Sequence, residues 1–165
     1  EQVDFVTYFN AGSAWAQKVG AGINPEDACG KKIAVQTATV QDTDELPARS
    51  EKCVKDGKPA IQVVKFDDQT AATSAVMLGQ ADAMSADSPV TAYAIKQSNG
   101  KLEAAGEVFD SAPYGWAVQK GSPLAASLQQ ALQHLIDNGV YKQVAANWGA
   151  ENGMIEKPVV NGAIN

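Results

Sequence analysis

The sequence predicts an α/β fold in which a mostly parallel sheet is covered by helices on both faces. Between Lys32 and Phe109, short apolar segments alternate with helical ones, which is typical of strand–helix–strand units. Residues 15–20 and 116–121 also read almost alike, and each follows an aromatic, turn-rich stretch. We expect these two segments to be strands that bracket one lobe of ordinary domain size.

The individual elements follow from apolar patterning and from turn residues. Strands are expected at residues 3–9, 14–19, 32–36, 61–66, 81–86, 102–109 and 115–119. Helices are expected at residues 24–27, from the turn at 37–39 to residue 57, and from a cap at Asp67 or Asp68 to residue 78. Further helices are expected at residues 90–97, from Ser122-Pro123 to Gly139, and at residues 140–148. Asn24 and Pro25 suit the cap and first residue of a helix. Pro47 should kink or restart the second helix because proline lacks an N–H group, and Gly79 should end the third.

The C-terminal helices carry an apolar stripe that needs a partner surface. Leucine or isoleucine recurs at helical spacing at positions 124, 128, 132, 135 and 136, and Val140, Tyr141, Val144 and Trp148 continue the stripe. The stripe can cover the lobe's own sheet, or it can belong to a further lobe.

Composition and charge argue against two classes of protein. The net charge of −6 over 165 residues does not suit a nucleic-acid surface, and Lys31-Lys32, the only adjacent basic pair, is better read as a solvated strand entry. No apolar run approaches the roughly eighteen residues of a membrane helix. The chain starts without a methionine and inside an apolar-alternating strand, so we expect a processed or deliberately cut piece.

Cys29 and Cys53 are the only cysteines. A metal site would need more ligands, and the one histidine, His134, lies on a helix far along the chain. A disulfide is favoured over two free buried thiols, and it would indicate an oxidising compartment.

Polar residues follow two strand ends, where open α/β sheets bind ligands. Thr39 can cap a helix whose free N–H groups would accept an anion, although a purely structural cap is the more common role. Asp87 can cap a helix or face an ammonium group, and propensity alone favours the cap. Together the two positions would suit a zwitterionic α-amino acid. No nucleophile with its base is evident, so we expect a binding protein without a cofactor or metal rather than an enzyme.

Several segments, in order, resemble the polar-amino-acid solute-binding proteins of ABC transporters (family 3, type II periplasmic-binding fold). The segments are residues 3–9, 27–42, 77–83 with Asp87, 112–121 and 128–149. The resemblance covers nearly the whole chain and implies mostly the second lobe of such a protein. It implies a first hinge strand at 1–13, the ligand-binding lobe at 14–112, a return hinge strand at 113–121, and C-terminal helices at 122–165 that pack on the first lobe.

The resemblance also implies site residues. Thr39 and the Val40 amide fall where the family holds the ligand carboxylate, and Asp87 falls on the ammonium partner. Gln36 and Gln41 fall where side chains line the cleft and contact the R group of the ligand.

Two departures from the family pattern concern the anion-binding turn. Ala38 replaces the turn glycine, and Val40 replaces a second threonine, so carboxylate binding would depend on backbone N–H groups. Nothing here matches the first lobe, which in the family supplies an arginine that pairs with the carboxylate. The sequence therefore does not identify the amino acid that binds, because half of the specificity pocket would lie on that lobe.

The function implied is extracytoplasmic binding of an amino acid, by closure of two lobes, for delivery to an ABC permease. The precursor would carry a signal peptide and, in one alternative, a lipid anchor, so that the protein meets the membrane only through the anchor or the permease. Other readings are the effector domain of a transcription regulator, which would not normally keep a disulfide, and a dehydratase-like enzyme on the same fold.

The absence of the first lobe has a consequence for association. Leu128, Leu132, Leu135 and Trp148 would expose an apolar patch, and hinge strands cut from their partners invite exchange between chains. We expect a swapped homodimer or a higher species.

Overall fold

A five-stranded sheet with the strand order β3-β2-β4-β1-β5 organises the chain. The structure is a computed structural model, and it describes residues 2–162. The strands are β1 (Val3–Lys18), β2 (Lys32–Gln36), β3 (Gln62–Phe66), β4 (Ala83–Asp87) and β5 (Leu102–Gln119). The chain divides into two compact units, one formed by Ser13–Phe109 and the other by the described residues before and after that range.

The parallel part of the sheet is confined to its first three strands. β2 pairs in parallel with β3 on one side and with β4 on the other. β1 is antiparallel to β4, with Ser13 opposite Asp87 and Gln17 opposite Ala83. The predicted α/β class with helices flanking the sheet is confirmed, and the sheet is mixed.

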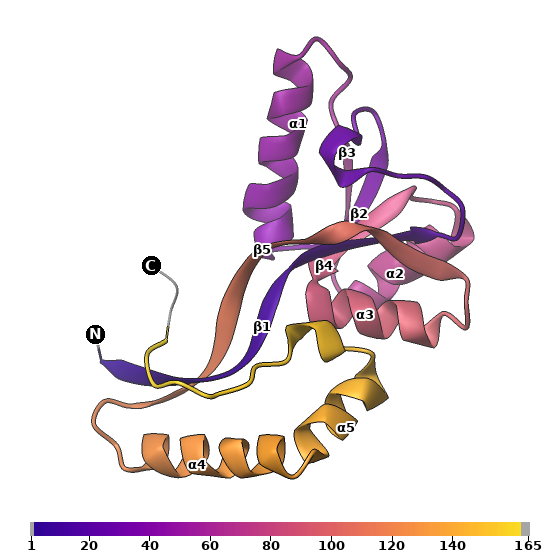
Figure 1. The fold of residues 1–165 in the computed structure, drawn as a ribbon. Helices are drawn as coiled ribbons and strands as arrows, with labels where there is room; N and C mark the ends of the chain where they lie inside the picture. Colours follow the sequence, from indigo (N-terminus) through magenta and orange to yellow (C-terminus); the bar gives the residue numbers. More distant parts are fainter. Residues whose placement is uncertain (1, 163–165) are drawn as a thin grey trace. The chain divides into compact units, whose positions relative to one another are not determined.

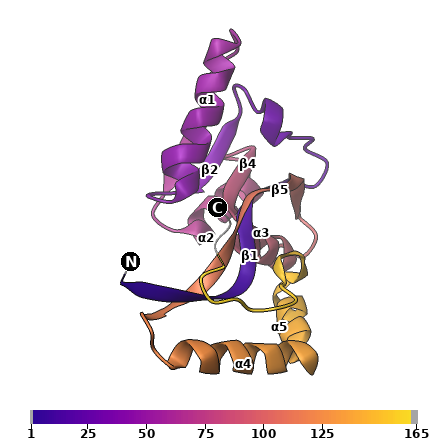
Figure 2. The same ribbon diagram turned by 60° about the vertical axis from the view of Figure 1, so that its left-hand side comes forward.

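Two pairs of predicted strands are each one long strand. The segments expected at 3–9 and 14–19 are both part of β1, and those expected at 102–109 and 115–119 are both part of β5, as can be followed in Figures 1 and 2. Gly12 lies between the first two segments, and Gly115 begins the last one. Neither glycine has a positive φ, and a glycine in ordinary extended geometry weakens a strand without ending it.

The helices begin and end where the turn residues predict. In the Ser13–Phe109 unit they are α1 (Leu46–Lys55), α2 (Gln69–Leu78) and α3 (Ser88–Gln97), and in the other unit α4 (Leu124–Asp137) and α5 (Val140–Trp148). Asn24 caps a short 3-10 turn, Pro25–Asp27, by accepting a hydrogen bond from the Glu26 N–H. A π-helical turn, Gln41–Glu45, precedes α1, and Pro47 lies in the first turn of that helix, so the helix restarts as proline predicts.

The core of the Ser13–Phe109 unit has two layers, one on each face of the sheet. Alternate residues of a strand point to opposite faces, and β2 shows this clearly. Ile33 and Val35 pack with Leu46 and Cys53 of α1. Ala34 packs on the other side, in a cluster with Ala72, Ala75 and Val76 of α2 and with Met84. The small residues of β4 let both layers approach the sheet closely.

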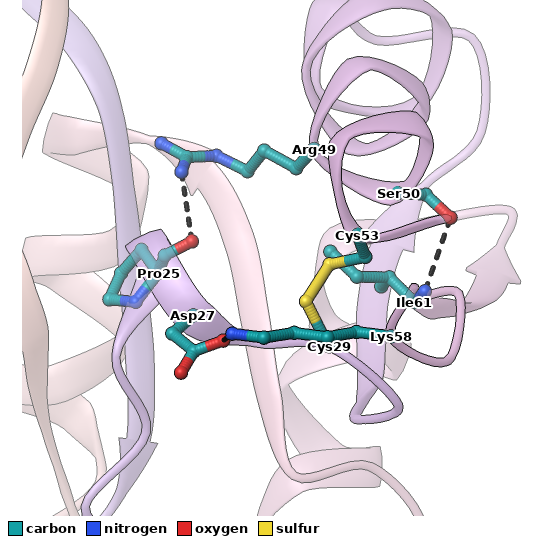
Figure 3. The surroundings of a disulfide bond; sticks show 8 residues. All are labelled: Pro25, Asp27, Cys29, Arg49, Ser50, Cys53, Lys58 and Ile61. Atoms are coloured by element: carbon teal, nitrogen blue, oxygen red, sulfur yellow. Dashed lines mark hydrogen bonds and ion pairs between the residues drawn. A yellow bond between two sulfur atoms is a disulfide. The ribbon is translucent and has the colours of Figure 1, made fainter. Parts of the chain in front are cut away.

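Cys29 and Cys53 form the predicted disulfide (Figure 3). The bond joins the loop after the 3-10 turn to α1, and the two cysteines are 24 residues apart in sequence. The same loop is held by Arg49, whose Nη1 donates to the Pro25 carbonyl at 2.8 Å, and by an ion pair of 2.8 Å between Lys58 and Asp27.

The second unit packs its helices against its own strand segments. Val6 and Val118 form a buried cluster with Ala125, and Leu128 packs against it. The expected exposed patch is therefore partly wrong, because Leu132 is buried, whereas Leu135 and Trp148 are 40% and 53% exposed. None of the described helices is long and apolar enough to cross a membrane.

Candidate functional site

The turn after β2 contains Thr39 and Val40, whose backbone N–H groups are predicted to bind an anion. Thr39 Oγ1 donates to the Gln36 carbonyl at 2.8 Å, and the N–H groups of Asp42 and Thr43 donate to the Thr39 carbonyl at 3.0 Å. The described hydrogen bonds of this turn use the amides of Ala38, Asp42 and Thr43. None of them uses the amide of Thr39 or Val40, and N–H groups at the start of a helix commonly lack a partner within the helix.

A buried carboxylate holds the turn in shape. Ala38 has a left-handed backbone, with φ of +62°, which explains why a glycine would suit this position. Its N–H donates to Asp42 Oδ2 at 3.0 Å, and Asp42 Oδ1 pairs with Lys65 Nζ at 2.7 Å. The Lys65 ammonium and the Ala38 N–H together hold the pKa of Asp42 below its ordinary value.

Asp87 lies at the carboxyl end of β4, next to this turn. It occupies the N-cap position of α3, yet its side chain makes no capping hydrogen bond to that helix. Its Oδ1 instead accepts a hydrogen bond of 2.8 Å from Gln41 Nε2, and the same nitrogen donates to Ser13 Oγ at 3.0 Å. The geometry therefore departs from the cap that propensity favours and directs the carboxylate toward the turn.

All five residues predicted to bind ligand line one hollow of about 340 Å³. They are Gln36, Thr39, Val40, Gln41 and Asp87, joined there by Ala38, Gln69, Ala86 and Val90. The hollow offers N–H donors at the turn, a carboxylate at Asp87, and an apolar wall of Val40, which is 65% exposed, and Val90. Such a set can bind an anionic and a cationic group of one small molecule. Ligand contact by these residues stays a prediction.

Sequence reasoning missed two features of this site. Gln69 lines the hollow, and its position just after β3, a third strand end, was the available signal. The amide nitrogen of Gln41, expected near the R group of a ligand, contacts Ser13 and Asp87. The sequence alone does not predict these contacts, because Ser13 and Asp87 are 28 and 46 positions from Gln41.

Comparisons with known proteins find relatives that are named for binding amino acids. The chain is 40% identical, over 98% of its length, to an arginine-binding protein, ArgT, of Corynebacterium glutamicum, and covers 54% of it. It is 29% identical, over 92% of its length, to an ABC transporter glutamine-binding protein, GlnH, of Bacillus subtilis, again covering 54%. No protein-family model matches the chain.

A solved structure extends the comparison to the fold. An ancestral cationic amino-acid solute-binding protein matches with a TM-score of 0.70 and 29% identity, over 90% of this chain and 62% of the other. The chain therefore has the fold of the type II periplasmic binding proteins, and the relatives that it resembles in sequence are named as amino-acid-binding proteins. It spans about half the length of the curated relatives it matches.

Proposed function

We propose that this chain is one ligand-binding lobe of an extracytoplasmic protein that binds a polar amino acid and delivers it to an ABC permease. The observation that carries the proposal is the single hollow in which N–H donors of the 39–40 turn and the Asp87 carboxylate come together. An α-amino acid carries a carboxylate and an ammonium on one carbon, and these two groups match the two halves of the hollow. A second lobe, closing over the first, would complete the pocket.

The relatives make cationic and amide side chains the first candidates for the ligand. One relative is named for arginine and one for glutamine. The apolar surface of Val40 and Val90 would contact the aliphatic stem of such a ligand, and Gln36 its polar end. The C-terminal helices α4 and α5 would pack on the other lobe, as the family resemblance implies.

Two other functions receive less support. The effector domain of a cytosolic regulator would not normally keep the Cys29–Cys53 disulfide, which favours an extracytoplasmic location. An enzyme on this fold would need a general acid or base near the ligand. Among the described residues that line the hollow, Asp87 is the only one that can take this role, and it is engaged by Gln41.

A ligand screen tests the proposal. Isothermal titration calorimetry of the full-length natural protein against the twenty L-amino acids should give tight binding of a polar one, with L-arginine and L-glutamine tested first. Binding of no amino acid would overturn the proposal.

Asp87→Asn tests the site within that protein. Asn keeps an oxygen for the Gln41 amide but loses the charge that would meet an ammonium. Losing one partner of a buried charged pair costs about 2–5 kcal/mol, or roughly thirty- to several-thousand-fold in affinity. We expect that loss in calorimetry with little change in thermal unfolding. Unchanged affinity would return Asp87 to a structural role.

A further inference from the structure

The first residue of the π-helical turn contacts a cross-strand pair of the sheet. Gln41 is buried, and its Nε2 donates to Ser13 Oγ and to Asp87 Oδ1. Ser13 on β1 and Asp87 on β4 lie directly opposite each other in the antiparallel register. One amide group therefore contacts the carboxyl end of β4 and the opposite position within β1.

The last residue of the same turn contacts the next pair on that face. Glu45 Oε1 accepts a hydrogen bond of 2.6 Å from Trp15 Nε1, and its Oε2 accepts one of 2.7 Å from Ser85 Oγ. Trp15 and Ser85 are again opposite each other in the register. Residues four apart share one face of a helical turn, and residues two apart share one face of a strand, so the two contacts are compatible and the turn is attached to the sheet at two points.

The π-helical turn Gln41–Glu45 directly follows the residues that are predicted to bind an anion. Gln41 directly follows Val40, whose amide belongs to the anion-binding turn. The chain divides into its two compact units between Gly12 and Ser13, so the Ser13 contact ties the turn to β1 at the residue where the ligand-binding unit begins. Gln41 therefore links the turn that carries the N–H groups directly to the Asp87 carboxylate, and the Glu45 contacts support this link.

We propose that Gln41 is the positioning residue for Asp87, holding its carboxylate in the orientation that receives the α-ammonium of the ligand. The inference rests on the proposed function and deepens it, since it gives Gln41 a role through Asp87 instead of direct contact with the R group. A hydrogen bond to a charged group is stronger than one between neutral groups, and two partners leave the amide little freedom to rotate. If Gln41 had only a structural role, it would stabilise the unit but would not affect binding of the α-ammonium more than binding of the rest of the ligand.

Gln41→Met tests the proposal in the full-length natural protein, because methionine keeps the length of the side chain and removes the donor. The probes are L-arginine and 5-guanidinopentanoic acid, which is arginine without its α-ammonium. We expect the variant to bind L-arginine about tenfold to a hundredfold more weakly and to bind the deaminated analogue as the wild type does. Gln69→Met is the matched control: it removes the same amide from the same hollow, but this amide donates to Met84 Sδ, so any change should be equal for both probes. An equal loss for both probes in Gln41→Met would overturn the proposal.

A second measurement needs no ligand. In nitrogen-15 NMR spectra of the ligand-free protein, the side-chain amide signals of Gln41 should move on Asp87→Ala, which removes one acceptor. Signals that stay in place would contradict the bond on which the inference depends. If the wild type binds no amino acid, the proposed function fails, and this measurement still decides whether Gln41 holds Asp87.

Discussion

At the scale of single residues, Ala38 is the most unusual position of the candidate site. Its backbone is left-handed, a conformation that costs an L-residue about 1–2 kcal/mol, and its N–H is held by Asp42. The strain is thus maintained by the buried carboxylate of Asp42, beside the turn that we propose to bind an anion.

Ala38→Gly should therefore stabilise the protein. Relief of the left-handed strain exceeds the extra unfolded-state entropy of glycine, roughly 0.5–1 kcal/mol, so we expect a gain of about 0.5 kcal/mol in the free energy of unfolding. Urea denaturation measures it. Ala71→Gly, in helix α2, should instead lose about 1 kcal/mol. A loss at Ala38 equal to that at Ala71 would show that the strain is not present in solution.

Asp42 predicts a pH dependence at the same turn. Because Lys65 and the Ala38 N–H lower its folded-state pKa below the ordinary 3.8, the carboxylate stabilises the fold fully above that pH and loses its contribution as pH falls through the lower folded value. Asp42→Asn should reduce the free energy of unfolding at pH 7 and lose less stability than the wild type between pH 4 and pH 2. Denaturation at both ends of this window checks it. Asp44→Asn, on the exposed side of the same π-helical turn, is the control and should change the pH profile less.

At the scale of elements, the Cys29–Cys53 disulfide connects a loop with little secondary structure to α1. The loop before β2 contains one short 3-10 turn. The disulfide and Arg49 attach it to α1, and the ion pair of Asp27 with Lys58 attaches it to the segment that follows α1. Arg49 also lies over the Phe109 ring at 4.5 Å. This corner of the lobe is therefore cross-linked by covalent, ionic and cation–π contacts at once.

Replacing both cysteines with serine should cost about 3 kcal/mol, because the disulfide closes a loop of 24 residues in the unfolded chain. The free energy of unfolding of the double variant measures this cost. A reducing agent should destabilise the wild type by a similar amount and leave the variant unaffected. If the reducing agent does not change the wild type, the disulfide does not contribute to stability.

At the scale of the whole molecule, the C-terminal helices α4 and α5 expose several apolar side chains to solvent. Leu135 is 40% exposed, Val140 41% and Val144 51%, while Leu132 and Ala145 of the same helices are buried. The helices therefore bury one side of their stripe within their own unit and leave another side uncovered.

This uncovered side should make the 165-residue chain associate when it is produced alone. We expect a dimer or larger species in light scattering at high concentration. Leu135→Gln combined with Val144→Gln should shift the chain toward the monomer. Val54→Gln, at a position of α1 that is 59% exposed, should not. A monomer for the unmodified chain at high concentration would count against the expectation.

The sequence by itself determined most element positions and the candidate site residues. Capping and breaking residues act locally, so Asn24, Pro47 and Gly79 predicted where helices start and stop. Strand ends in an α/β sheet meet at one edge, and for this reason the positions of Thr39 and Asp87 along the chain were enough to predict that the two residues lie close together.

Only the tertiary structure decided the features that depend on pairing between distant segments. The joining of two predicted strands into β1, and again into β5, depends on pairing with neighbouring strands of the sheet. The burial of Leu132 depends on packing within the C-terminal unit. The contact from Gln41 to Ser13 and Asp87 exists because β1 and β4 happen to place those residues opposite each other, and a register of that kind follows from the assembled sheet rather than from local preference.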